Sequence, residues 1–299
     1  MGYTHKSVLL QEVTEGLSVK SGDIIIDGTL GGGGHSVEIA KSLGAEVRII
    51  GLDLDQDALT HAKERLDVYT NNTSFHNVSF RHLDKVLEDL NIQKVNRIIL
   101  DLGLSSNQFE NSGRGFSFQK NEPLLMTFKK ELGPEDLTAK EIVNTWDESN
   151  IADIIYGYGE ERYARKIAQK IVEAREIKPI ETTFDLVEII KQATPKSYQH
   201  RKINPATKTF QALRITVNSE IDSLKEGLKK GFNSLEKNGR LAVISFHSLE
   251  DRIVKHYFKE KALQNEGLLL SKKPIISNET ELQKNPRARS AKLRIIEKA

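Results

Sequence analysis

The sequence predicts an α/β protein that is built on a mostly parallel sheet and interrupted by an all-helical insertion. Near both ends of the 299-residue chain, short apolar runs typical of buried strands alternate with apolar residues at helical spacing. Residues 107–206 contain helix-like patterns but no convincing strand. Because a crossover between parallel strands is rarely so long, this stretch is interpreted as an inserted helical domain. Residues 1–106 and 207–299 would then form the two parts of one sheet domain.

Consecutive glycines at 31–34 join the apolar run 24–26 to a helical pattern that begins near Val37. Glycine permits turns that other residues cannot adopt, and it lets a ligand approach the backbone with no Cβ atom in between. In an open α/β sheet such a turn lies at the carboxyl end of a strand, where nucleotide-like ligands bind. The glycine turn is therefore the first candidate site.

The spacing of these glycines argues against a dinucleotide or a bound triphosphate. Ser36 and Val37 stand where G-x-G-x-x-G requires its third glycine, and no Gly-Lys-Ser/Thr sequence closes the turn as in a P-loop. A second apolar run, 47–52, ends in Asp53, where an acid that binds ribose hydroxyls is expected. The pattern favours an adenosine ligand without a pyrophosphate.

The remaining elements are expected in the following order. An amphipathic segment covers 5–17, and a helix follows Asp53 over 58–66. The acidic opening of that helix faintly resembles a calcium loop, but Ala58 stands where the loop needs glycine, so calcium is not expected. Further strands are expected at 78–80, 95–104, 240–246, 268–270 and 291–296. Further helices are expected at 134–143, 151–156, 160–173, 183–193, 210–235 (ended by Gly239) and 248–259.

Composition excludes several classes of protein. With 38% hydrophobic residues the chain can bury a full core, and it contains neither a membrane-length apolar run nor a signal-peptide pattern, so a cytoplasmic protein is expected. It has no cysteine, which excludes disulfides, thiolate metal sites and a cysteine nucleophile. His61, His76 and His82 are scattered without zinc-site spacing, and no metal is expected.

Two basic stretches stand out in a chain of net charge +2. Residues 194–214 contain no acid, and residues 284–298 contain Glu297 as their one acid. The first stretch carries Lys196, Arg201, Lys202, Lys208 and Arg214, and the second carries Lys284, Arg287, Arg289, Lys292, Arg294 and Lys298. Localised positive charge of this kind favours contact with a polyanion, although solvated helix faces would show the same pattern.

Five segments of the sequence stand out: DGTLGGGGHS (27–36), DLGLSS (101–106), GRGFSF (113–118), NPATKTFQALR (204–214) and SFHSLEDR (245–252). Together they resemble the bacterial 16S ribosomal RNA cytosine-N4 methyltransferase family, RsmH or MraW. The similarity runs in order along nearly the whole chain, which makes an accidental match improbable.

The resemblance implies a seven-stranded, Rossmann-like S-adenosylmethionine-dependent methyltransferase fold with a helical insertion that helps to hold RNA. The implied reaction is N4-methylation of a specific cytidine in the decoding region of 16S ribosomal RNA of the small (30S) subunit. The implied cofactor is S-adenosyl-L-methionine. The family's cofactor contacts fall on Gly33, Gly34, His35, Asp53, Phe80, Asp101 and Gln108.

Residue chemistry agrees with several of these contacts. Gly33 and Gly34 would let the backbone approach the methionine part of the cofactor, and Asp53 suits the ribose. Phe80 would stack on adenine, or else belong to the core. His35 would be a polar group near the methionine, or else cap the helix or satisfy a nearby carbonyl.

Methylation of cytosine C5 requires a covalent cysteine adduct, whereas the exocyclic N4 can attack the sulfonium methyl directly if acceptors orient its N–H groups. Asp101 is the candidate acceptor, although the Asp/Asn-Pro-Pro-aromatic motif of DNA amino methyltransferases is absent after it. Two alternatives remain: amino methylation of another nucleic acid, and a non-catalytic ribosome-assembly protein. A nicotinamide dehydrogenase is disfavoured by the glycine spacing.

The candidate RNA contacts are Arg201, Lys202, Lys208 and Arg214, which we expect to line a groove beside the insertion and to contact phosphates. The chain departs from the family pattern at Ser7, where proline is usual, and at Lys208, where arginine is usual. It also lacks the family's usual acid and arginine around Met126.

Overall fold

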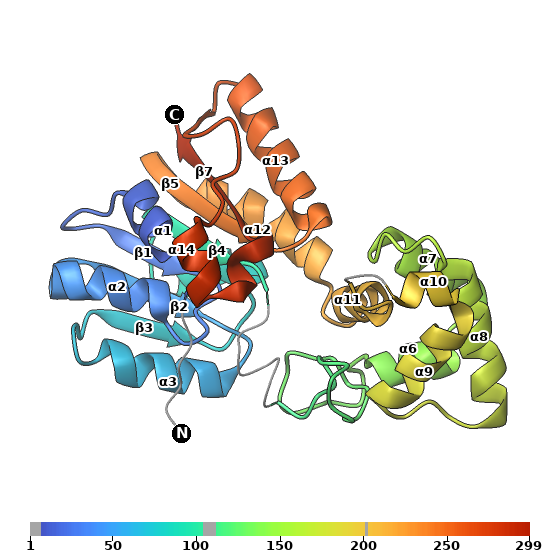
Figure 1. Ribbon diagram of the computed structural model, residues 1–299. Helices are drawn as coiled ribbons and strands as arrows, with labels where there is room; N and C mark the ends of the chain where they lie inside the picture. Colours follow the sequence, from blue (N-terminus) through green and yellow to red (C-terminus); the bar gives the residue numbers. More distant parts are fainter. Residues whose placement is uncertain (1–6, 104–111, 201–202) are drawn as a thin grey trace. The chain divides into compact units, whose positions relative to one another are not determined.

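The computed structural model describes residues 7–103, 112–200 and 203–299 (Figure 1). The chain divides into two compact units, Met1–Ser105 with Ile221–Ala299 and, between them in sequence, Ser106–Glu220. Three of the candidate site residues, Gln108, Arg201 and Lys202, lie outside the described residues.

The first unit contains a seven-stranded sheet with the order β3-β2-β1-β4-β5-β7-β6, which confirms the predicted α/β class. Strands β1 to β5 pair in parallel, while β7 pairs antiparallel with both β5 and β6. The strand order reverses between β1 and β4, and open α/β sheets bind their ligands at such a point. The strands are β1 (Ile24–Asp27), β2 (Arg48–Leu52), β3 (Thr73–His76), β4 (Val95–Asp101), β5 (Leu235–Ser245), β6 (Gly267–Leu269) and β7 (Lys292–Lys298).

Helices cover both faces of this sheet. Because side chains alternate along a strand, Ile98 and Leu100 of β4 enter one hydrophobic cluster and Ile99 enters the other. The first cluster includes residues of α4 (Leu83–Asp89), α12 (Glu220–Ser234) and α13 (Ser248–Leu263). The second includes residues of α1 (Leu10–Leu17) and α2 (Gly34–Leu43). The unit also contains α3 (Gln56–Leu66), α14 (Glu279–Lys284) and the 3₁₀ turns η1 (Gly44–Glu46), η2 (Phe80–His82) and η3 (Pro286–Ser290).

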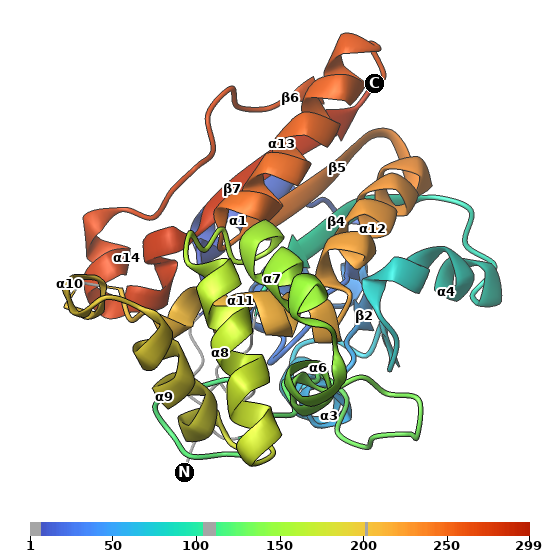
Figure 2. The ribbon, with the colours of Figure 1, turned by 90° about the vertical axis from the view of Figure 1, so that its right-hand side faces the viewer.

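Helices make up the regular structure in the described part of the second unit, where the β pairing is one isolated bridge between Pro123 and Thr182. These helices are α6 (Ala139–Thr145), α7 (Glu148–Gly157), α8 (Ala164–Ile177), α9 (Thr183–Ala193), α10 (Lys196–Gln199) and α11 (Ala206–Val217). Helix α8 packs against α7 and α9, as Figure 2 shows. Helix α11 contacts α6, α7 and α9, so this unit extends past residue 206, where the sequence analysis placed the end of the insertion.

The single long helix expected over 210–235 is wrong, because the chain breaks at Asn218 and Ser219 between α11 and α12. The Asn218 side chain accepts a hydrogen bond from the Phe128 N–H and donates one to the Met126 carbonyl. Ser219 adopts a left-handed φ of 48°. Long-range hydrogen bonds therefore end α11, and Gly239 lies within β5 instead of closing a helix.

The strand expected at 78–80 is also wrong. The third strand is β3, which lies at the edge of the sheet and whose residues are all half-buried. Because Thr73 and Ser74 are polar, β3 does not form an apolar run and was not predicted from one. Ser79 instead caps the turn η2, since its hydroxyl accepts a hydrogen bond from the Arg81 N–H.

No helix in the described ranges has both the length and the apolar character needed to cross a bilayer.

Candidate active site

Three strands of the first unit end at one edge of the sheet, and each brings a carboxylate there. Asp27 is the last residue of β1, Asp101 is the last residue of β4, and Asp53 directly follows β2. Parallel neighbouring strands place their carboxyl ends together, so the acids share this edge with the glycine turn that leads into α2. We call Asp27, Asp53 and Asp101 the carboxylate cluster.

The glycine turn uses its glycines in different ways. Gly31 and Gly33 have φ values of 49° and 71°, which other residues adopt only with strain. A Cβ atom on Gly34 would lie 1.8 Å from Ser7 Oγ, and one on Gly33 would lie 3.1 Å from Ala62 Cβ. Among the described residues, the nearest atom to a Cβ on Gly31 would be the Thr29 carbonyl oxygen at 3.9 Å. Side chains of the protein itself thus occupy the space beside Gly33 and Gly34. No described atom packs closely beside Gly31, so a ligand could approach the backbone there.

Asp53 supports the glycine turn from the end of β2. Its Oδ2 accepts a hydrogen bond from the Gly31 N–H at 2.8 Å, and its Oδ1 accepts one from the Asp55 N–H at 2.8 Å. Burial raises the pKa of Asp53 to about 6. A carboxylate oxygen has more than one lone pair, so Asp53 can still accept hydrogen bonds from ribose hydroxyls. Asp55 in turn caps α3, so the acidic segment before that helix has a structural role.

Asp101 has an unsatisfied acceptor. Its N–H donates to Thr29 Oγ1 at 2.6 Å, which fixes the end of β4 against the loop after β1. Its side-chain Oδ1 is buried and has no hydrogen-bond partner among the described residues. Burial, with repulsion from Asp27 and Glu250, raises the pKa of Asp101 to about 8. A buried polar atom without a partner is rare and unfavourable, so this oxygen is suited to a ligand that donates.

His35 and Asp27 lie behind Asp101. His35 is buried, and its Nε2 lies 3.0 Å from the Val8 carbonyl, to which it can donate as an N–H. Its Nδ1 is 4.0 Å from Asp101 Oδ2. The Ser36 hydroxyl donates to Asp27 at 2.6 Å, while burial raises the pKa of Asp27 to about 6. Asp27 was not among the site residues predicted from the sequence, although its place at the end of the first apolar run resembles that of Asp53 after the second.

Phe80 packs into the core of the first unit. It belongs to η2 and lies against the cluster that includes α12. A Cβ atom on Gly28 would lie 2.9 Å from Phe80 Cβ, and one on Gly227 would lie 2.4 Å from Phe80 Cδ2. These two glycines make room for the Phe80 side chain, so the residue has a packing role in addition to any contact with adenine.

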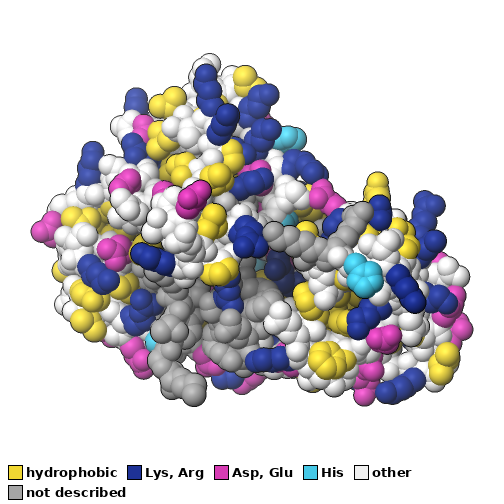
Figure 3. Space-filling model, in the orientation of Figure 1, with side chains coloured by type: hydrophobic (Ala, Val, Ile, Leu, Met, Phe, Trp, Pro, Cys, Tyr) yellow, Lys and Arg dark blue, Asp and Glu magenta, His cyan; other side chains and the backbone are white. Residues whose placement is uncertain are grey.

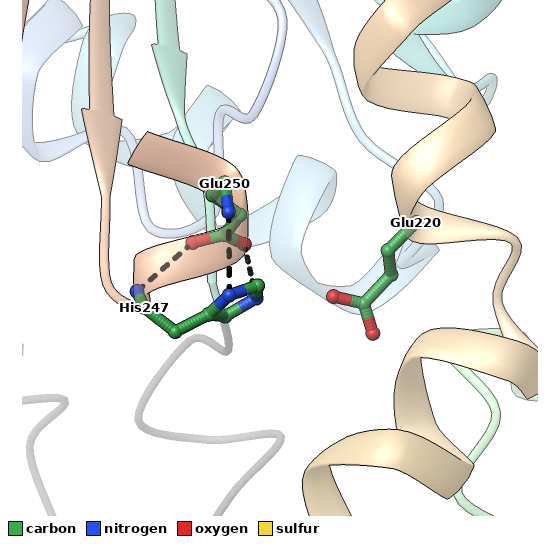
Figure 4. Close-up of side chains that lie close together, drawn as sticks. All are labelled: Glu220, His247 and Glu250. Carbon is green, nitrogen blue, oxygen red and sulfur yellow. Dashed lines mark hydrogen bonds and ion pairs between the residues drawn. The ribbon is translucent and has the colours of Figure 1, made fainter. Parts of the chain in front are cut away.

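His247 and Glu250, which the sequence analysis did not propose as site residues, lie beyond the end of β5 (Figure 4). Glu250 Oε2 accepts hydrogen bonds from the backbone N–H groups of Phe246 and His247 at 2.8 and 3.3 Å. His247 Nδ1 accepts from the Glu250 N–H at 3.4 Å, which completes a capping box for α13. Glu220, also drawn in Figure 4, is the last residue of the second unit.

Two of the candidate RNA contacts are described, and both have partners within the second unit. Lys208 Nζ donates to the Glu160 carbonyl. Arg214 forms a bidentate pair with Glu220, with Nε and Nη2 each 2.8 Å from a carboxylate oxygen. An RNA phosphate would have to share the Arg214 guanidinium with Glu220 or displace the Glu220 carboxylate. Figure 3 shows Lys and Arg side chains spread over the visible face, with Asp and Glu between them.

The sheet order, the antiparallel β7 and the carboxylates beside a glycine turn define a Rossmann-like α/β methyltransferase. The model of the MraW methylase family matches residues 2–299, and the chain belongs to that family.

Three similar curated proteins share the name "Ribosomal RNA small subunit methyltransferase H". The protein from Clostridium botulinum (strain Kyoto / Type A2) is 45% identical over 100% of both chains. That from Sulfurihydrogenibium sp. (strain YO3AOP1) is 46% identical over 97% of this chain and 98% of its own length. That from Geobacter sp. (strain M21) is 43% identical over 99% of both chains.

Proposed function

We propose that this chain transfers the methyl group of S-adenosylmethionine to N4 of a cytidine in the 16S ribosomal RNA of the small ribosomal subunit. Membership of the methylase family supports methyl transfer, and the names of the relatives support ribosomal RNA as the substrate. The five sequence segments quoted above support the choice of cytidine N4. The observation that carries the proposal is the buried Oδ1 of Asp101 at the carboxyl ends of the strands, which has no hydrogen-bond partner among residues 7–103, 112–200 and 203–299.

The carboxylate cluster fits this cofactor by charge. Asp27 and Asp53 have pKa values raised to about 6, and Asp101 to about 8, because burial disfavours their ionised forms. A ligand with an ammonium group and a sulfonium would favour ionised carboxylates again. Asp101 would hold one of these positively charged groups, while Asp53 would accept the ribose hydroxyls. When bound, the cofactor supplies an electrophilic methyl group.

The residues of the chain then have two tasks in the reaction. Asp53 and the Gly31 N–H fix the turn on one side of the ligand. Asp101 accepts hydrogen bonds, from the cofactor's ammonium group or from the N4 amino group of the cytidine. With no cysteine in the sequence, a covalent adduct at cytosine C6 through a thiolate is excluded, so N4 would take the methyl group directly. The bond between that methyl and the cofactor's sulfur would break to leave the thioether, and the proton then given up by N4 would pass to solvent.

The RNA contacts remain those of the basic stretch 194–214. Arg201, Lys202 and Lys208 would neutralise phosphates, and Arg214 would do so only by sharing its pair with Glu220. The target cytidine would leave its stacked position to reach the methyl group, as substrates of base-modifying enzymes commonly do.

Nucleoside mass spectrometry of small-subunit ribosomal RNA tests the proposal. RNA treated with the protein and S-adenosylmethionine should contain N4-methylcytidine. The Asp101→Asn variant should form little of it, while the surface control Asp89→Asn should behave like the parent. Methyl transfer to carbon C5, or no transfer to RNA by a protein that binds the cofactor, would contradict the proposal.

A further inference from the structure

A pocket lies at the opposite ends of these strands, near the start of β1 and β4. Its volume is about 240 Å³, and nine residues line it: Ser18, Lys20, Asp23, Arg97, Glu236, Lys237, Asn238, Arg240 and Glu297. Arg97 is near the start of β4 and Asp101 is at its end, roughly 13 Å away at the rise of a β-strand. The volume is below the roughly 300–1,000 Å³ of pockets for drug-sized ligands, so the pocket suits an ion or a very small molecule.

The acidic residues of this pocket already have partners. Asp23 Oδ2 accepts from the Lys20 N–H at 2.9 Å and lies 3.2 Å from Arg97 Nη2. Glu297 pairs with Arg240 Nε at 2.8 Å. Glu236 accepts a hydrogen bond from the Asn96 side chain. These bonds commit all three carboxylates to neighbouring protein groups.

The cationic residues keep unused donors. The Arg97 guanidinium is buried, with 7% of the side chain exposed, and it donates to the Asn96 and Ser18 carbonyls. Its Nε–H has no partner among the described residues. The ammonium groups of Lys20 and Lys237 likewise form no hydrogen bond or ion pair within the described part of the chain. Burial lowers the pKa of Arg97, which means that its charge is incompletely compensated.

We propose that this pocket binds a phosphate group, either as free inorganic phosphate or as the terminal phosphate of a nucleic acid. Arg97 lines the pocket with a buried guanidinium whose Nε–H has no partner among the described residues, and Lys20 and Lys237 line it from exposed positions. Charge-assisted hydrogen bonds of this kind are the strong ones, and phosphate accepts several at once. The site is independent of the proposed methyl transfer, because it uses no residue of the carboxylate cluster.

The probe is inorganic phosphate, titrated into the full-length protein at constant ionic strength with potassium chloride as the balancing salt. Phosphate should raise the thermal midpoint of the parent, since a ligand that binds the folded state stabilises it. The double variant Lys20→Ala/Lys237→Ala should raise the Kd for phosphate by about tenfold or more, given the strength of charge-assisted hydrogen bonds. Arg97→Lys, which keeps the charge but loses the Nε donor, should do the same.

The matched control is Lys85→Ala/Lys229→Ala, which removes the same charge from exposed positions on α4 and α12 and should leave the response unchanged. A second arm compares a dinucleotide with and without a 5′-phosphate. Binding of the phosphorylated form alone, without a response to inorganic phosphate, assigns the site to a nucleic-acid terminus. The proposal is overturned if neither probe raises the thermal midpoint of the parent. It is also overturned if Lys20→Ala/Lys237→Ala binds phosphate as tightly as the parent and the control do.

Discussion

Binding of S-adenosylmethionine should release a proton from Asp101. Burial and two neighbouring acids raise the pKa of this carboxyl to about 8, so the ligand-free protein holds it mostly neutral at pH 7. A cationic ligand binds more tightly to the ionised carboxylate, so its binding shifts the protonation equilibrium of Asp101 toward the ionised form. With a pKa of about 8, roughly 0.9 proton should leave per cofactor bound at pH 7.

The same reasoning fixes the direction and size of the pH dependence. Affinity should rise with pH while Asp101 is protonated, by about ninefold between pH 6 and pH 7 for this group alone. Asp27 and Asp53, with pKa values of about 6, add a smaller effect in the same direction. Affinity should be measured below pH 7.5, because the cofactor's own amino group titrates at about pH 8, and loss of its proton would lower the affinity as pH rises.

Calorimetry at pH 7 in buffers of different ionisation enthalpy measures the protons released. The parent and Asp89→Asn should both release close to one proton, whereas Asp101→Asn should release far less and bind more weakly. A parent that binds the cofactor tightly with no proton release would refute the assignment of Asp101 as the acceptor for a cationic ligand.

Three further predictions follow from the same geometry. The pKa of Asp101 is about 8 in the folded protein, above its unfolded value, so the folded protein is most stable when this carboxyl is protonated and loses stability as pH rises through about 8. At pH 8, Asp101→Asn should therefore have a higher free energy of unfolding than the parent, by at least about 1 kcal/mol, and a higher thermal midpoint. A lower midpoint would contradict this. Gly31→Ala and Gly33→Ala should both lose stability, because both positions have a positive φ, but Gly33→Ala should lower the thermal midpoint further because its Cβ also meets Ala62. Gly31→Ala should weaken cofactor binding, and equal effects of the two variants on both quantities would argue against the space beside Gly31. Neutralising Lys202 and Lys208 should reduce the slope of log affinity for single-stranded RNA against log salt by about 1.4, at roughly 0.7 per phosphate contact; filter binding should show no such change in the Lys85/Lys229 control, and an unchanged slope would move the RNA path to another surface.

The elements predicted correctly are those whose signal is local. Strands β1, β2, β4 and β7 each contain at least two consecutive aliphatic residues, and such residues favour a buried strand. Strand β3 was missed because an edge strand need not be apolar. The break after α11 was missed because Asn218 bonds to Met126 and Phe128, residues far away in the sequence.

The candidate site was predictable in its position. Asp53 and Asp101 each follow an apolar run, and the ends of parallel strands share one edge, so periodicity and topology suffice to place both acids beside the glycine turn. The family resemblance depends equally on sequence alone, since its five segments are contiguous stretches of residues.

The chemistry of the site was decided only by the tertiary structure. Whether Asp101 is neutral depends on its burial and on Asp27 and Glu250, which come from other strands and helices. Whether a glycine faces a ligand or its own protein depends on which side chain occupies the adjacent space, as Ala62 does beside Gly33. Desolvation, repulsion and steric exclusion act through distance in space, and the order of residues along the chain does not specify those distances.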